Sequence, residues 1–175
     1  VTRSVSPNNR VTTYVYNDQG LVETVTETPP AASPGNVRVT RYIYDAAGQM
    51  TQVITPDLII LDMVYDVKGR LESVTDNLNQ TIEYVYDEYN NLIRTDTSSS
   101  DSSLALRVQQ VYDVRNRMVE IRAPQNDVED SVIQRLLDDN SNLMGMIDPN
   151  SSPSNNRFDG EDRLIGNTHR LNGVT

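Results

Sequence analysis

Few residues in this chain could carry catalysis. His169, in the stretch GNTHR, is the only histidine, so a Ser-His-Asp triad would have to use it. No nucleophile-elbow sequence accompanies it. The chain has no cysteine, which excludes a thiolate nucleophile, a disulfide and a cysteine zinc site. We interpret His169 as a histidine in a solvated loop.

The carboxylates offer two other kinds of chemistry. A glycosidase acid and base would need two of them at a defined separation, and Glu129/Asp130 is the pair to consider because it stands outside the repeats described below. The stretch DDNSN (138–142) begins like a calcium loop, but Leu143 replaces the required Gly and Pro149 the required Glu. We expect no enzyme, no metal site and no cofactor, with adventitious calcium at the acidic turns as the alternative.

Charge and hydropathy exclude further classes. The formal net charge is -10 and the basic residues are scattered singly, which argues against nucleic acid as a partner. No run approaches the roughly 18 consecutive apolar residues of a membrane-spanning helix, so we expect no membrane insertion by this segment. The apolar set, with nine Tyr, one Phe and no Trp beside many Val, Ile and Thr, favours strands.

A seven-residue motif recurs along the whole chain. It reads YNDQGLV, YDAAGQM, YDVKGRL, YDEYNNL, YDVRNRM, LDDNSNL and FDGEDRL, anchored at Tyr16, Tyr44, Tyr65, Tyr86, Tyr112, Leu137 and Phe158. The anchors step by 28, 21, 21, 26, 25 and 21 residues, which is a period of 21 with insertions. Two insertions fall in polar or breaker-rich loops at about 29–35 and 98–103. We therefore expect residues 1–175 to form a single repeat array. An active site normally occurs once, so we interpret the motif as architecture.

Each anchor lies in a strand-like run, and the residues after it have turn chemistry. In pairs such as Tyr14/Tyr16 the two rings project from the same face of a strand, and the residue between them places an apolar side chain on the other face. Both faces are therefore partly apolar, which predicts a layer packed or curled on each side. The acid after the anchor can accept a hydrogen bond from the backbone two residues on. The fourth turn position, mostly Gly or Asn, favours a left-handed backbone.

We therefore predict tandem antiparallel β-hairpins in an all-β fold. A second apolar residue follows the first strand residue by three positions, which predicts a bulge or twist that the sequence does not locate. The predicted structural positions are Tyr16, Tyr44, Asp45, Gly48, Tyr65, Asp66, Gly69, Tyr86, Asp87, Asn90, Tyr112, Asp113 and Asn116.

The tandem YDxxGRL pattern resembles the YD repeat, also called the RHS repeat. Tyr65 to Leu71 is a full match, Tyr44 to Met50 and Tyr86 to Leu92 are close, and the last two units are degenerate. The family includes bacterial RHS polymorphic toxins, toxin-complex cocoon components, wall-associated proteins and teneurins. The resemblance implies a curved, spiralling sheet that forms a hollow shell, secreted or at the cell surface, around a polypeptide cargo such as a toxin domain.

The width of this sheet suggests that seven repeats are too few to enclose a folded protein. Seven two-strand repeats spaced about 4.8 Å apart make a ribbon roughly 67 Å wide, which closes to a ring of about 21 Å. A folded 100-residue guest needs roughly 34 Å. We expect the remaining repeats of a larger parent protein as partners, and edge-to-edge self-association of this open sheet as a hypothesis.

Our leading interpretation is a structural shell segment that acts by steric seclusion. The alternative is an adhesion module on the same scaffold, in which exposed Tyr, Asn and Asp bind a glycan or a receptor. Loss of binding on replacement of Tyr84 or Tyr89 would favour that alternative.

Overall fold

The computed structural model is all-β over the residues it describes, which are all except 34, 102–104, 125–129, 148–152 and 170–175. The strands are β1 Thr2–Val5, β2 Val11–Tyr16, β3 Val22–Thr28, β4 Arg38–Tyr44, β5 Met50–Ile54, β6 Ile60–Tyr65, β7 Leu71–Asp76, β8 Thr81–Tyr86, β9 Leu92–Ser98, β10 Ala105–Tyr112, β11 Met118–Pro124, β12 Asp130–Leu137, β13 Leu143–Ile147, β14 Pro153–Phe158 and β15 Leu164–His169. The described residues include no helix that could cross a membrane.

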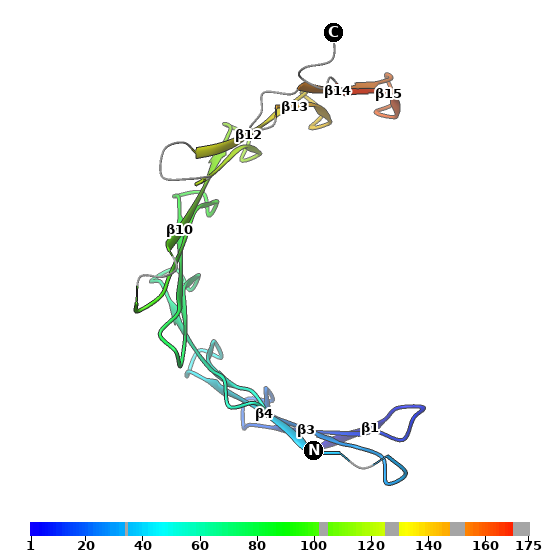
Figure 1. Ribbon diagram of the computed structural model, residues 1–175, viewed down its shortest axis with the longest axis vertical. Coiled ribbons are helices and arrows are strands. Elements are labelled where there is room, and N and C mark those ends of the chain that lie inside the picture. The colour runs from blue at the N-terminus through cyan, green and yellow to red at the C-terminus, as the bar shows by residue number, and fades with distance from the viewer. Residues whose placement is uncertain (34, 102–104, 125–129, 148–152, 170–175) are drawn as a thin grey trace. The chain divides into compact units, whose positions relative to one another are not determined.

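The strands form one open sheet in sequence order, β1 to β15. The sheet is antiparallel, as the sequence predicted, and successive strands lie side by side (Figure 1). Seven repeats predicted 14 strands. The additional one is β1, which precedes the first anchor and pairs with β2 through Thr2↔Tyr14 to Val5↔Val11. It escaped prediction because no turn motif precedes it.

The chain divides into two compact units. The first comprises Val1–Ile82 with Ser99–Asp101, and the second Glu83–Ser98 with Ser102–Thr175. Strands β1 to β7 lie in the first unit and β9 to β15 in the second. The geometry below is described within one unit at a time.

Six of the Tyr-Asp hairpins carry a β-bulge just after the turn. In the β2–β3 ladder Tyr16 pairs with Val22 and Tyr14 with Val25. Glu23 is the additional residue, so the three-residue spacing of Val22 and Val25 matches the two-residue spacing of the tyrosines. The same register shift recurs in the hairpins β4–β5, β6–β7, β10–β11, β12–β13 and β14–β15. The predicted bulge is confirmed, and the structure supplies its position.

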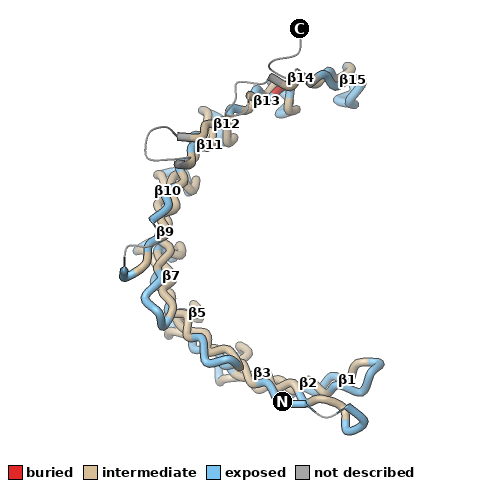
Figure 2. Tube along the Cα trace, viewed as in Figure 1, coloured by how far each residue is buried: buried red, intermediate tan, exposed pale blue. Residues whose placement is uncertain are grey.

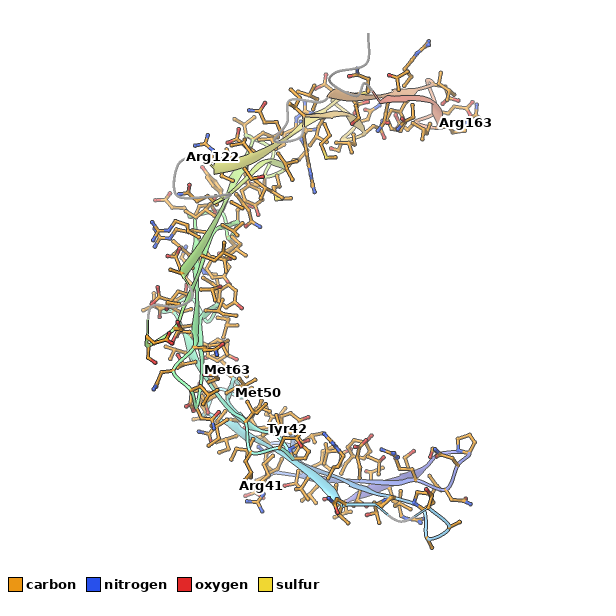
Figure 3. The ribbon with its side chains drawn as sticks, viewed as in Figure 1. Arg41, Tyr42, Met50, Met63, Arg122 and Arg163 are labelled. Carbon is orange, nitrogen blue, oxygen red and sulfur yellow. The ribbon has the colours of Figure 1, made fainter. Side chains whose placement is uncertain are left out.

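The bulge gathers apolar side chains onto one side of the sheet. We call this side the tyrosine face. On β4 to β6 its apolar residues, by cross-strand register, are Tyr42, Tyr44, Met50, Val53, Leu61, Met63 and Tyr65. Figure 3 shows Tyr42, Met50 and Met63 on this side and Arg41 on the other. The opposite side mixes apolar with polar residues, as in the pairs Ile43↔Gln52 and Val64↔Ser73.

The sheet is a single layer without a closed core over the described residues. None of their hydrophobic side chains is fully buried, and Gly145 is the one described residue in the buried class (Figure 2). On the side opposite the tyrosines, Ile43 is 46% exposed and Val64 52%. Of the expected alternatives, a layer packed or curled on each side, the packed layer was wrong for the described residues, because neighbouring side chains on one sheet cover one another only partly.

Candidate functional site

The Tyr-Asp turns are the recurring sites of the molecule. Every anchor is the last residue of an even-numbered strand, from Tyr16 at the end of β2 to Phe158 at the end of β14. In each turn the amide of the second residue donates to the carbonyl of the sixth, and the fifth donates to the second, as in Asp66 N→Arg70 O (2.8 Å) and Gly69 N→Asp66 O (2.9 Å). These two bonds close the loop between the strands.

The fifth residue of every motif has a left-handed backbone. The φ angles are Gly20 78°, Gly48 83°, Gly69 78°, Asn90 69°, Asn116 59°, Ser141 71° and Asp162 60°. Gly has no Cβ to clash in this region, and Asn and Asp tolerate it better than most residues. The left-handed conformation predicted for these turns is confirmed.

The acid that follows the anchor holds the turn together. Asp45 Oδ1 accepts hydrogen bonds from the amides of Ala47 and Gln49, both at 2.9 Å. Asn17 Oδ1 accepts the equivalent bonds from Gln19 (3.0 Å) and Leu21 (2.9 Å). The same oxygen has this role in Asp66, Asp87, Asp113 and Asp159. The sequence predicted only the hydrogen bond from the amide two residues after the acid, and the structure adds a second one from the amide four residues after it.

Arginine at the sixth position adds an ion pair in three turns. Arg70 lies 2.7 Å from Asp66, Arg117 2.7 Å from Asp113, and Arg163 2.8 Å from Asp159. The backbone amide of Arg70, followed by its guanidinium, lowers the pKa of Asp66. The Arg117 side chain, then its amide, lowers the pKa of Asp113.

The remaining two shifted turn acids follow the same logic. In Asp159 the backbone amide of Arg163 is the largest cause of a lowered pKa, and its side chain the next. In Asp138 the Asn142 side-chain amide lowers the pKa most. All four carboxylates are therefore held in the ionised form that accepts the turn's hydrogen bonds.

Polar side chains link each turn to the next turn in the same unit. In the first unit Gln19 Nε2 donates to Ala46 O (3.2 Å), and Gln49 Nε2 donates to Gly69 O (3.0 Å). In the second unit Asn142 Nδ2 donates to Asp162 Oδ1 (2.8 Å). Sequence reasoning missed these links because the partners are 20 to 27 residues apart.

The anchor tyrosines Tyr44 and Tyr65 each donate a hydrogen bond to the preceding repeat, a contact that we call the clasp. The Tyr44 hydroxyl donates to Val22 O and the Tyr65 hydroxyl to Met50 O, both at 2.8 Å. Each acceptor is the residue that opens the second strand of the preceding hairpin. Burial, with Tyr42 nearby, raises the pKa of Tyr44, so the phenol stays protonated as a donor.

The degenerate seventh repeat keeps this clasp with a different residue. Phe158 has no hydroxyl, and Asn156, two residues earlier on the same face, donates from Nδ2 to Leu143 O at 2.8 Å. Leu143 is the strand-opening residue of the repeat before, like Val22 and Met50. Phe158 was read from sequence as a degenerate anchor, and the structure adds a partner that replaces its lost hydrogen bond.

Turns at the other ends of the strands have the same form and were missed from sequence. They contain Asn9 (φ 59°), Leu58 (φ 61°) and Asn79 (φ 58°) in the left-handed region. In one of them Thr55 N donates to Ile59 O (2.9 Å) and Leu58 N to Thr55 O (3.0 Å). Two of these turns could have been predicted from a Pro-Asn or Pro-Asp pair shortly before a strand, in the stretches SPNNR and TPDLI.

The residues considered for other chemistry are dispersed. His169, which we expected in a loop, is instead the last residue of β15, so that expectation was wrong. Asp130 is the first residue of β12, and Glu129 lies outside the described residues. Asp138 is occupied by its own turn through Asn142. Across the described residues no group of three or more His, Cys, Asp or Glu side chains could hold a metal ion. Tyr84 lies half-buried in β8, and Tyr89 is an exposed turn residue.

Comparisons with known proteins agree with this geometry. A family model described as Teneurin YD-shell matches residues 3–153. No curated protein matches the chain.

Solved toxin-complex structures share the fold. The crystal structure of TcdB2-TccC3 aligns with a TM-score of 0.74 at 13% identity, and that of TcdB2-TccC3-Cdc42 with 0.73 at 14%. Each alignment covers 90% of this chain but only 9% of the matched chain, so the chain spans about a tenth of the length of these structures.

Proposed function

The chain belongs to the teneurin YD-shell family, and we propose that it is a wall segment of a shell that encloses or presents another polypeptide, such as a toxin domain. The observation that carries the proposal is a sheet of mutually clasped hairpins whose described residues have no closed hydrophobic core. Such a sheet separates two spaces, and seclusion requires no catalytic residue. We propose accordingly that the segment is not an enzyme.

The two sides of the sheet suggest which one faces the enclosed polypeptide. On β4 to β7 most side chains of the tyrosine face are aromatic or aliphatic, and Arg38, Thr40 and Asp76 are the exceptions. The other side alternates apolar residues with Arg41, Gln52 and Asp62. A broad exposed apolar surface usually indicates a site that contacts another polypeptide. We assign the tyrosine face to the enclosed polypeptide and the mixed side to the exterior.

The partners in this proposal are the further repeats of a longer parent protein and the polypeptide they surround. Two observations support a longer wall. The chain spans 9% of the matched toxin-complex chains. Its 15 strands, spaced about 4.8 Å apart, would close only to a ring too narrow for a folded guest. The proposed location is outside the producing cell or at its surface, where such a shell would deliver or display its cargo.

A photo-crosslinking experiment tests the proposal in the full-length parent protein. The photoreactive residue p-benzoylphenylalanine replaces Met63 in one preparation and Val64 in another. These neighbours project from opposite sides of β6, so they form a matched pair. We expect crosslinks from position 63 to the enclosed polypeptide and none from position 64. Equal crosslinking from both positions, or from neither, would contradict the assignment.

A further inference from the structure

A groove of about 340 Å³ lies between the fourth and fifth Tyr-Asp turns, both within the second unit. Its walls include Tyr89 and Val114 at the two turn tips and Tyr112 at the end of β10. Tyr89 is 72% exposed and Val114 fully exposed. One turn-to-turn contact, between Asn91 and Asn116, crosses the groove, and the shell role leaves the rest of its lining unused.

The carboxylates that line the groove are committed to their own turns. Asp87 accepts hydrogen bonds from the amides of Tyr89 (2.9 Å) and Asn91 (2.8 Å), and from Asn91 Nδ2 (2.8 Å). Asp113 accepts from the amides of Arg115 and Arg117 and pairs with the Arg117 guanidinium at 2.7 Å. An amine or a metal ion would have to displace these bonds. An anion would meet two carboxylates on a chain of net charge -10.

Uncharged hydrogen-bonding groups remain available. The hydroxyls of Tyr44 and Tyr65 bind the preceding repeat, but no described residue hydrogen-bonds the hydroxyl of Tyr112. Asn91 Nδ2 donates to Asn116 Oδ1 at 3.0 Å, which fixes both amides across the floor of the groove. Within the described part of the chain, Asn91 Oδ1 and Asn116 Nδ2 have no further partner, so they present one acceptor and one donor.

This set of groups matches an uncharged polyhydroxylated ring. The C–H face of a pyranose packs on an exposed aromatic ring such as that of Tyr89, and its hydroxyls pair with amide and phenol groups. The volume lies at the small end of ligand sites, which suits one or two sugar residues. We propose that the groove between these turns binds a neutral sugar residue of a glycan, with Tyr89 as the stacking platform and Tyr112, Asn91 and Asn116 as the polar contacts.

The test is an amide-shift titration of the isotopically labelled 175-residue chain by NMR. The probes are lactose, maltose and chitobiose, with sialyllactose as the anionic counterpart of lactose. We expect saturable shifts in the turns 86–92 and 112–118 with at least one neutral disaccharide, and weaker binding of sialyllactose. No saturable shift with any neutral disaccharide, shifts confined to other residues, or preference for sialyllactose would overturn the proposal.

Paired variants assign the contacts. Tyr89→Ala removes the ring and should weaken binding at least tenfold, whereas Lys68→Ala, at the same turn position in another repeat, should leave it unchanged. Tyr112→Phe removes only a hydroxyl and should weaken binding several-fold. Tyr44→Phe, in the first unit, is its control. Equal affinity in Tyr89→Ala and the unsubstituted chain would overturn the site even if a sugar binds. Retained amide-shift dispersion in every variant shows that each has folded.

Discussion

At the scale of single residues, each turn requires one residue with a left-handed backbone, and the residue types found there differ in how well they tolerate it. Gly, Asn, Asp and Ser fill the Tyr-Asp turns, but the turn after β5 places Leu58 at φ 61°. A left-handed backbone costs an L-residue with a bulky side chain about 1–2 kcal/mol. Leu58 is 74% exposed, so its side chain recovers little of that cost by packing.

We therefore predict that Leu58→Asn stabilises the chain by about 1 kcal/mol, because Asn tolerates this backbone. Leu78→Asn is the matched control: Leu78 is 67% exposed in a similar turn, but its φ is not positive. Urea unfolding of both variants measures the difference. A stability gain of the same size in both would assign the effect to lost apolar exposure and contradict the backbone argument.

The turn acids predict sensitivity to acid. The folded-state pKa values of Asp66, Asp113, Asp138 and Asp159 lie below the unfolded value of about 3.9. The folded chain therefore binds fewer protons, and this contribution to stability is complete above that value and is lost as the pH falls through the folded-state pKa.

Asp113→Asn isolates one of these acids. Asn17 shows that an amide side chain can make the same turn bonds, so the variant should keep its turn, lose the ion pair with Arg117, and depend less steeply on pH between about 5 and 2. Unfolding free energies measured across that range check the prediction. An unchanged slope would mean that Asp113 is equally acidic in the folded and unfolded chains.

At the scale of elements, the hairpins are held by two kinds of bond beyond the sheet ladder. A tyrosine hydroxyl reaches back one repeat, and a side chain at the turn reaches forward one repeat. A repeat that stacks only on its neighbours depends on these nearest-neighbour contacts. Asn156 in the seventh repeat preserves the backward contact where the anchor is Phe158.

Tyr44→Phe removes the hydroxyl that binds Val22 O and keeps the aromatic ring. We expect it to lower the unfolding free energy by about 1 kcal/mol, the usual net value of such a hydrogen bond. Tyr42→Phe is the control on the same strand and face, because within the described residues no hydrogen bond to the Tyr42 hydroxyl is present. Comparable losses in the two variants, measured by chemical unfolding, would show that the Val22 bond contributes little.

At the scale of the whole molecule, a single-layer array should transmit damage only to adjacent strands. Gly145 on β13 offers the test, since a Cβ there would lie 2.7 Å from the backbone oxygen of Ser154 on β14. Gly166 occupies the corresponding place on β15, opposite Arg157, where a Cβ would make an ordinary 4.0 Å contact.

We predict that Gly145→Ala increases hydrogen exchange in β12 to β15 and leaves β2 to β6 at wild-type protection, whereas Gly166→Ala changes neither set. Mass spectrometry of exchanged peptides measures both. Loss of protection throughout the first unit would show that the array unfolds as one cooperative body instead of by nearest neighbours.

Among the described residues, β1 and β15 are the edge strands of the sheet, and each has one side on which no described strand pairs with it. We predict that the isolated chain self-associates through these edges in a concentration-dependent way, which light scattering would detect. A proline at Arg3, in the middle of exposed β1, should weaken the association by removing a backbone donor and blunting that edge. A strict monomer at high concentration would contradict edge pairing.

The sequence alone was sufficient for the local features. The all-β class, the seven turns, their left-handed residues and the role of Asp45 and its equivalents could be predicted, because every hydrogen bond involved lies within one seven-residue motif. The bulge was predicted as well, although not its position. The return turn at Leu58 was missed although Pro56 and Asp57 indicate a turn, because Leu itself does not favour a left-handed backbone.

Tertiary structure decided the contacts between residues of different repeats, which lie 13 to 23 positions apart in the chain. Register alone brings the Tyr44 hydroxyl to Val22, lets Asn156 replace the hydroxyl missing from Phe158, and sets Tyr89 beside Tyr112 across a groove. The tertiary structure also shows that no second layer covers the sheet over the described residues. A turn motif fixes the path of its own loop, whereas the contacts between repeats depend on how adjacent strands align, which no single motif encodes.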